Sequence, residues 1–465
     1  MLAELRGLNE ECGVFGVWNH PRASQIAYYA LHSLQHRGQE GTGIVATDGK
    51  TVRIRKGQGL VTEVFNAECM EKLQGTGAIG HVRYSIGGLN GFENVQPLLF
   101  RSQNGDLAIA HNGNLTNSRV LRGMLEEEGS IFQTAADAEV LAHLAKRGSS
   151  GPFPERMMHA LRELDGAYAF VMLTEEALYV ALDPHGLRPL ALGKLGEGHV
   201  VASETCAFDL IGATYVRDVE PGEFLTIDDR GVHSQHFGEQ KKQALCSMEY
   251  VYFSRPDSNL NGLNVHTARK KLGKALAREY PIEADVVTGV PDSSLSAAIG
   301  YAEATGLPYE LGLIKSRYVG RTFIEPSQSL REQGVKLKLS AVRGVVEGKR
   351  VIMVDDSFVR GTTSRRITTM LKDAGATAVH VLIASPTIKY PCYYGMDTLS
   401  TDELVAANHS VEEMRVMIAA DSLGFLSVSK MQEVFECGLC LACFTGEYPT
   451  WEGERCVECV QASGR

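Results

Sequence analysis

The sequence predicts two domains, an α+β layered domain in the first half of the chain and an α/β domain with a parallel sheet in the second. Up to about residue 235, many short strand-like segments separated by turn residues accompany a few helix-like segments. Beyond that point apolar strands alternate with helices, which is typical of a parallel sheet. The polar stretch GEQKKQ at 238–243 is the predicted join between the two domains.

Short apolar runs bounded by turn residues predict the strands of the first domain. Two longer segments, 24–38 and 135–148, carry apolar residues at helical spacing and predict helices. The predicted strands cover residues 12–18, 41–48, 51–57, 77–84, 107–113, 167–174, 177–183, 189–195 and 199–204.

Continuous apolar runs predict the strands of the second domain, because parallel strands are buried on both faces. The helices between them are expected from the 3.6-residue spacing of their apolar positions. In chain order the sequence predicts helix 265–280, strand 284–290, helix 293–306, strand 351–357, helix 363–375 and strand 378–385.

Composition excludes several classes of protein. No apolar run approaches the roughly 20 residues that span a bilayer. The first eleven residues, MLAELRGLNEE, lack the apolar core of a secretory signal, so we expect a cytoplasmic protein with no membrane partner. The net charge of −10 argues against nucleic acid as the main partner.

The segment 351–364, VIMVDDSFVRGTTS, predicts a ribose-phosphate site. Asp355 and Asp356 end a buried strand, where open α/β sheets place ligands, and adjacent acids suit a ribose diol and Mg²⁺. Gly361 and the hydroxyl residues after it open a helix, whose free N–H groups bind phosphate. The string resembles the phosphoribosyl-pyrophosphate (PRPP) loop of type I phosphoribosyltransferases, whereas helix capping by Asp356 is the purely structural alternative.

A basic segment precedes this string. Residues 315–350 contain nine Lys or Arg against three Glu, an excess that suits a polyanionic substrate. We expect the segment to close over a pyrophosphate, and an ordinary solvated loop is the alternative.

Cys12 is the candidate nucleophile of the first domain, although a cysteine in an apolar strand is usually only buried. Three motifs favour catalysis: LQHRGQEGTGI at 34–44, GHVRYS at 80–85 and HNGNL at 111–115. Their order and spacing resemble the N-terminal-nucleophile (Ntn) glutamine amidotransferases. In that family the cysteine is the first residue of the mature chain. Its thiolate attacks the glutamine amide, and its α-amine, with a pKa of about 7.7–8.0, is the base.

The resemblance implies cleavage between Glu11 and Cys12, which makes residues 1–11 a propeptide. It also implies an oxyanion hole of Asn112 and the Gly113 N–H, and a glutamine pocket with Arg83 at the α-carboxylate, Asp137 at the α-amine and Arg37 in support. Where the family commonly has Thr, this chain has Ile86, so a hydroxyl contact to glutamine is missing or comes from Ser85.

Further motifs extend the resemblance to nearly the whole chain: SRPDS at 254–258, PDSS at 291–294 and KLSAVRG at 338–344. They resemble the glutamine PRPP amidotransferase family, in its subclass with a propeptide and an iron–sulfur cluster. The resemblance implies an αββα Ntn-hydrolase domain at 12–237 and a type I phosphoribosyltransferase domain at 244–465 whose loop 315–338 orders over PRPP. The implied PRPP-binding residues are Asp355, Asp356, Ser357, Arg360, Gly361, Thr362, Thr363, Lys315, Arg321 and Lys338, and Ser293 joins the two acids at Mg²⁺.

The activity that this resemblance implies is that of a pentosyltransferase. Glutamine is hydrolysed at Cys12, and the ammonia passes internally to displace pyrophosphate from PRPP, giving 5-phosphoribosylamine, the first step of purine synthesis. Purine nucleotides (AMP, ADP, GMP) are implied inhibitors, and a homotetramer or dimer is the implied assembly. Two alternatives are an Ntn amidotransferase that aminates a sugar phosphate, which the 351–364 string disfavours, and a non-enzymatic PRPP sensor, which would not need Cys12 or Asn112.

Ten cysteines in a cytosolic chain indicate metal binding or catalysis more than disulfides, and five of them lie between Cys437 and Cys459. The family resemblance implies a [4Fe–4S] cluster on Cys246, Cys392, Cys440 and Cys443. A zinc ribbon is a competing interpretation, because Cys437-x₂-Cys440 and Cys456-x₂-Cys459 have the right spacing, and free thiols are a third.

Overall fold

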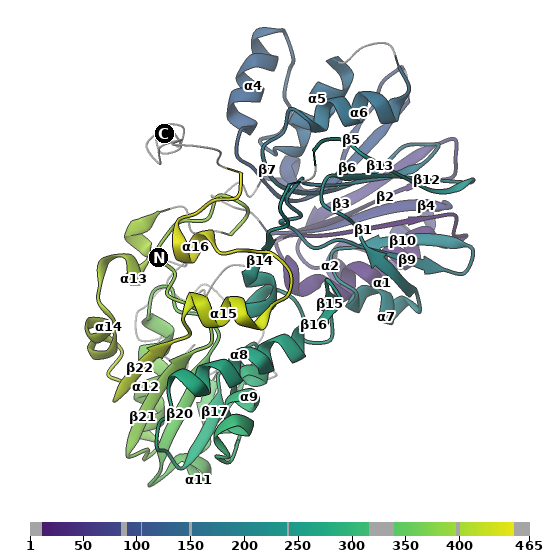
Figure 1. Cartoon of the computed structure of the whole chain (residues 1–465). Coiled ribbons are helices and arrows are strands. Elements are labelled where there is room, and N and C mark those ends of the chain that lie inside the picture. The colour runs from purple at the N-terminus through teal and green to yellow at the C-terminus, as the bar shows by residue number, and fades with distance from the viewer. Residues whose placement is uncertain are drawn as a thin grey trace.

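The structure is a computed structural model, and it describes residues 12–84, 91–103, 105–147, 151–239, 241–315, 339–396 and 400–450. Two sheets packed face to face form one domain, and a parallel sheet with its helices forms the other (Figure 1). Some positions from the sequence analysis lie outside the described residues: the predicted propeptide 1–11, Ser85, Ile86, most of the 315–338 loop with Arg321 and Lys338, and the pair Cys456 and Cys459.

The first domain is a sandwich of two antiparallel sheets. The first sheet has the order β11-β9-β10-β1-β4-β2-β3, with β1 Gly13–Trp18, β2 Gly41–Thr47, β3 Val52–Gln58, β4 Gly77–Arg83, β9 Ala191–Leu195, β10 Gly198–Ala202 and β11 Thr214–Asp218. The second has the order β13-β12-β8-β7-β6-β5, with β5 Leu98–Phe100, β6 Leu107–Leu115, β7 Gly166–Leu173, β8 Leu178–Leu182, β12 Glu223–Asp228 and β13 Gly231–His236.

Helices cover both outer faces of this sandwich (Figure 1). On β1, Phe15 and Val17 pack against the helices beside the first sheet, while Val14 and Trp18 point into the core between the sheets. The helices on the first sheet are α1 Ala23–Ser33, α2 Val61–Val64, α3 Ala67–Lys72 and α7 Cys206–Ile211, and those on the second are α4 Ser118–Glu127, α5 Ala138–Arg147 and α6 Phe153–Leu161. The predicted αββα architecture is therefore confirmed.

The second domain has a four-stranded parallel sheet with the order β17-β20-β21-β22. Along β20, Ile352 and Val354 pack on one face and Val351 and Met353 on the other, so helices bury both faces. The sheet strands are β17 Val286–Gly289, β20 Arg350–Asp355, β21 Ala378–Ile383 and β22 Ser422–Phe425, and the main helices are α8 Val265–Glu279, α9 Leu295–Thr305, α12 Thr362–Asp373, α14 Val411–Met417 and α15 Val428–Val434. The predicted α/β domain with a parallel sheet is confirmed.

Short elements complete the fold. The short helices are the 3₁₀ helices η2 Gln35–Arg37, η3 Phe92–Asn94 and η5 Thr401–Glu403, the π-helical segment η4 Glu249–Phe253, and the α-helices α11 Arg343–Val346, α13 Val405–Asn408 and α16 Ala442–Thr445. The short strand pairs are β14 Leu245–Cys246 with β23 Leu439–Cys440, β15 Asn259–Leu260 with β16 Leu263–Asn264, and β18 Leu313–Lys315 with β19 Leu339–Ala341. Within the described part of the chain no helix has the length and apolar character to cross a membrane.

The two domains contact each other through backbone and side chains. β13 ends at His236 and β14 begins at Leu245. Beyond this crossing, the Cys246 N–H donates to the carbonyl oxygen of Leu187, and Asn114 donates to that of Tyr393. In Figure 1, β14, β15 and β16 lie where the sandwich meets the second domain.

Candidate functional site

Cys12 directly precedes β1 and is held by one residue just after β4 and one in η2. Its thiol donates to the carbonyl oxygen of Tyr84, just after β4, at 3.3 Å. Its own carbonyl oxygen accepts from Arg37 Nε in η2 at 3.1 Å. The thiol is partly exposed, and Arg83 is near enough to interact electrostatically with it. The structure therefore brings together Cys12, Arg37 and Arg83, which the sequence placed in one site.

Asn112 and Gly113, the predicted oxyanion hole, lie on β6. The Asn112 side chain is 1% exposed, and both of its polar atoms lack a hydrogen-bond partner among the described residues. Because such atoms are costly to bury unpaired, this amide is suited to an incoming polar ligand. Gly113 has φ +131°, and a Cβ atom there would lie 2.1 Å from the carbonyl oxygen of Ala167. Only glycine therefore fits this position of β6.

Asp137 anchors β6 on either side of the predicted oxyanion hole. One oxygen lies 2.9 Å from His111 Nδ1, and the other accepts from the Leu115 N–H at 2.9 Å. Burial opposes the charge of Asp137, but His111 and the backbone donors hold its pKa below the usual value. A carboxylate keeps further lone pairs for an ammonium group, so the predicted contact with the α-amine of glutamine stays a prediction.

His81 connects the two sheets beside the same strand. Its Nε2 lies 3.0 Å from the carbonyl oxygen of His111, and burial lowers the pKa of His81 to about 3. A neutral His81 therefore ties the end of β4 to β6, the strand that carries Asn112. His81 and His111 belong to the motifs GHVRYS and HNGNL, but neither was among the predicted site residues.

Arg37 is buried and faces carboxylates. Nη1 donates to Glu204 at 2.6 Å and to Glu249 at 2.9 Å, and Nη2 donates to Glu249 at 2.7 Å. Its contact with the nucleophile is through the backbone of Cys12. The sequence predicted Arg37 in support of the glutamine pocket, and the structure gives that support a route through the Cys12 carbonyl.

The acid pair of the second domain, Asp355 and Asp356, lies at the carboxyl end of β20. Ser294 donates to Asp355 at 3.0 Å, Ser293 donates to Asp356, and Ser357 donates to Asp356 at 2.7 Å. Burial and then the neighbouring carboxylate raise the pKa of Asp355 to about 8, and burial also raises the pKa of Asp356. Two buried acids that resist ionisation together are suited to a cation.

The phosphate-binding turn follows directly. Gly361 has φ +69° and caps α12, which has no side-chain cap at its start. Thr362 and Thr363 are exposed at this helix end, as a phosphate-binding turn requires. Beside the turn, Arg360 pairs with Glu403 at 2.5 Å. Lys315, where the described chain stops before the predicted loop, pairs with Asp292 at 2.7 Å.

All four cysteines assigned to the cluster line one small cavity. Cys246 and Cys440 are register partners in the β14–β23 pair, and Cys392 and Cys443 complete the lining with Leu187, Met248, Tyr394, Met396 and Ala442. Burial raises the pKa of Cys440 to about 12, so thiolates here require positive charge beside them. Cys437, which the zinc interpretation requires beside Cys440, does not line this cavity and instead contacts Tyr250. Within the described ranges, no group of three or more His, Cys, Asp or Glu is close enough together to hold a single metal ion.

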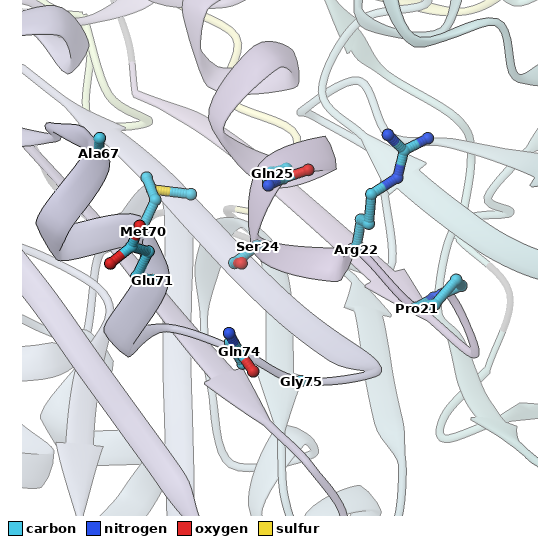
Figure 2. Close-up of a pocket in the computed structure, with 9 residues that line it drawn as sticks. All are labelled: Pro21, Arg22, Ser24, Gln25, Ala67, Met70, Glu71, Gln74 and Gly75. Carbon is cyan, nitrogen blue, oxygen red and sulfur yellow. The ribbon is translucent and has the colours of Figure 1, made fainter.

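A larger hollow lies on the outer side of the first domain, between the start of α1 and α3 (Figure 2). It contains none of the predicted site residues. Its lining consists of Pro21, Arg22, Ser24, Gln25, Ala67, Met70, Glu71, Gln74 and Gly75.

Comparison with known proteins decides the family. Residues 81–209 match the model of a glutamine amidotransferase domain. A Bacillus subtilis protein named amidophosphoribosyltransferase is 65% identical over 458 residues, which cover 97% of this chain and 96% of the relative. The chain belongs to the amidophosphoribosyltransferase family. A Staphylococcus aureus amidophosphoribosyltransferase is 52% identical over 95% of this chain and 92% of its own length.

Two solved structures agree with this assignment. The glutamine PRPP amidotransferase of B. subtilis in complex with ADP and GMP superposes with a TM-score of 0.91 at 64% identity, covering 96% of this chain and 99% of that one. A second structure, described as the allosteric regulatory enzyme of purine biosynthesis, gives a TM-score of 0.92 at 64% identity. The resemblance drawn from the sequence motifs is confirmed, and with it the first step of purine biosynthesis as the activity.

Proposed function

We propose that this chain makes 5-phosphoribosylamine from glutamine and PRPP with the residues described above. The observation that carries the proposal is relatedness at 65% identity over 97% of the chain. Two separate groups of candidate residues, one around Cys12 and one around Asp355 and Asp356, support it. ADP and GMP, which are bound to the B. subtilis structure, are the proposed inhibitors of this chain as well. The predicted homotetramer or dimer stays a prediction.

In the first site, we assign the nucleophile to Cys12. Its sulfur attacks the carbonyl carbon of the glutamine amide, and the α-amine of mature Cys12 takes the thiol proton and passes it to the departing ammonia. Asn112 Nδ2 and the Gly113 N–H stabilise the oxyanion. Water then hydrolyses the thioester to glutamate. The unpaired amide of Asn112 and the thiol held at Tyr84 support these roles.

In the second site, Asp355 and Asp356 hold the ribose hydroxyls of PRPP, and the start of α12 holds its 5-phosphate. Mg²⁺, held by Ser293 and the two acids, would neutralise charge on the leaving pyrophosphate. The raised pKa values of the buried acids support a cation there. Ammonia from the first site attacks C1 of PRPP and displaces pyrophosphate, and an internal route keeps the amine unprotonated.

The cysteine cavity holds a [4Fe–4S] cluster in this proposal. Its four thiols come from three distant parts of the chain, so the cluster would tie the carboxyl-terminal segment to the body of the protein. We assign the cluster this structural role and no redox role.

A PRPP-dependent glutaminase assay tests the whole proposal. We expect saturating PRPP to raise glutamine hydrolysis by on the order of tenfold, as coupled sites do, with glutamate and pyrophosphate released one to one. Glutamine hydrolysis that ignores PRPP, with amination of another sugar phosphate, would instead support the alternative amidotransferase.

The visible spectrum of the purified protein tests the cluster. We expect a brown protein with a broad absorption band, and Cys443→Ser should abolish the colour and lower the melting temperature because a four-point link is lost. Cys69→Ser, at a partly exposed cysteine outside the cavity, is the control that should keep the colour. A colourless protein that contains zinc would contradict the iron–sulfur assignment.

A further inference from the structure

The nucleophile is connected to the second domain by a buried ion cluster. Arg37 and Glu204 come from the first domain and Glu249 from η4 of the second, and their side chains are all 0% exposed. Arg188 lies 3.7 Å from Glu249 at the same place. Two arginines therefore face two glutamates in a region without solvent, where the interaction energy between charges is larger than in water.

Of the two glutamates, Glu249 accepts more hydrogen bonds from Arg37. Both of its oxygens accept from the guanidinium, at 2.9 and 2.7 Å, and such a bidentate pair fixes the plane of the arginine. Nε of that fixed plane donates to the Cys12 carbonyl oxygen. The direction of this third donor is thus set by a residue of the other domain.

Cys12 needs such a restraint. Once it is the first residue of the mature chain, no preceding peptide orients it, and β1 begins only at Gly13. The hydrogen bonds of Cys12 include the one that its thiol donates to Tyr84 and the one that its carbonyl oxygen accepts from Arg37. A shift of about 1 Å at a reacting group can cost on the order of a hundredfold in rate.

Glu249 is in turn held by residues of the second domain, which contains the proposed PRPP site. Ser254 donates to its carboxylate at 2.7 Å, and Arg269 donates to the backbone of Ser254 and of Tyr250. Arg269 is buried and interacts electrostatically with Asp356. Hydrogen bonds from Arg269 to the nucleophile, together with this electrostatic interaction, therefore connect the acid pair with Cys12.

We propose that Glu249 is a positioning residue for the glutaminase reaction: through Arg37 it orients Cys12, so that a residue of the phosphoribosyltransferase domain completes the glutamine site. The inference rests on the proposed role of Cys12 and adds a residue that the motifs did not include.

The test is Glu249→Gln in the full-length, matured enzyme with saturating PRPP. The amide keeps the shape but points an NH₂ group at the guanidinium, so we expect kcat for glutamine to fall by about tenfold to a hundredfold. KM for glutamine should stay within about twofold, and turnover with added ammonia should not change. Labelling of Cys12 by a diazoketone analogue of glutamine should slow in parallel, and Glu249→Asp, which keeps the charge, should recover part of the rate.

Glu223→Gln is the matched control. Glu223 is also buried, pairs bidentately with Arg217 at 2.8 and 2.6 Å, and accepts from Ser234. Among the residues that the structure describes, no hydrogen bond or ion pair joins it to Cys12. Unchanged glutamine turnover in Glu249→Gln would overturn the inference. So would equal loss of the glutamine and ammonia reactions, or a melting temperature well below that of Glu223→Gln, because either result means a purely structural role. Glutamine turnover surviving in Cys12→Ala would instead refute the nucleophile assignment itself.

Discussion

Cys12→Ala is expected to abolish phosphoribosylamine synthesis from glutamine, by at least about 10⁴-fold, while synthesis from added ammonia continues at the wild-type rate. The thiol is the only nucleophile proposed for glutamine, so its removal stops ammonia release. The Cys12 thiol is partly exposed and donates to a backbone oxygen, that of Tyr84, so we expect a methyl group in its place to leave the fold intact. Pyrophosphate release, measured with glutamine and then with ammonium chloride, gives both rates.

Two further measurements sharpen this result. Cys69→Ala, on α3, removes another partly exposed thiol and should leave both reactions unchanged. Mass spectrometry of the active protein should show Cys12 as the first residue, since the α-amine is the proposed base. An uncleaved chain with full glutamine-dependent activity would rule out that base, and loss of the ammonia reaction in Cys12→Ala would mean that the two sites are not separable.

The sequence predicted most strands that have an apolar face toward a core. It missed β13, whose residues are largely exposed, because an edge strand of polar composition carries no periodic signal. It also missed α4, where only Leu121 and Leu125 are buried and a single pair four residues apart is a weak pattern. β22 has four residues and was too short to recognise.

Predicted helix boundaries were wrong where the chain turns toward a site. The helix predicted over 24–38 ends at Ser33, and η2 then turns Arg37 inward to its buried carboxylates. The helix predicted from 293 begins at Leu295, because Ser293 and Ser294 donate to the acid pair instead. Local spacing cannot register such long-range contacts, and for the same reason no signal in EYVYF indicated Glu249. The cysteine cavity was predicted only through the family resemblance.

The double change Asp355→Asn and Asp356→Asn is expected to remove phosphoribosylamine synthesis with either nitrogen donor, by at least about 10²–10³-fold, and to spare glutamine hydrolysis measured without PRPP. The reason is electrostatic: the two carboxylates are the proposed contacts to the ribose diol and the cation. Pyrophosphate release and glutamate formation, measured side by side, separate the two effects.

The double variant should lose activity without losing thermal stability. Burial raises the pKa of both acids, and the charge of Asp356 raises that of Asp355 further, so the ionised forms weaken the fold, and neutral amides relieve that cost. We therefore expect a melting temperature equal to or above that of the wild type. Asp285→Asn is the matched control, since Asp285 pairs with Arg350 at the opposite end of β20, outside the site. Normal pyrophosphate release in the double variant would refute the PRPP assignment, whereas a collapse in melting temperature would show that the pair holds the sheet together. An inactive enzyme of undiminished stability is the combination that only a binding role for the two acids explains.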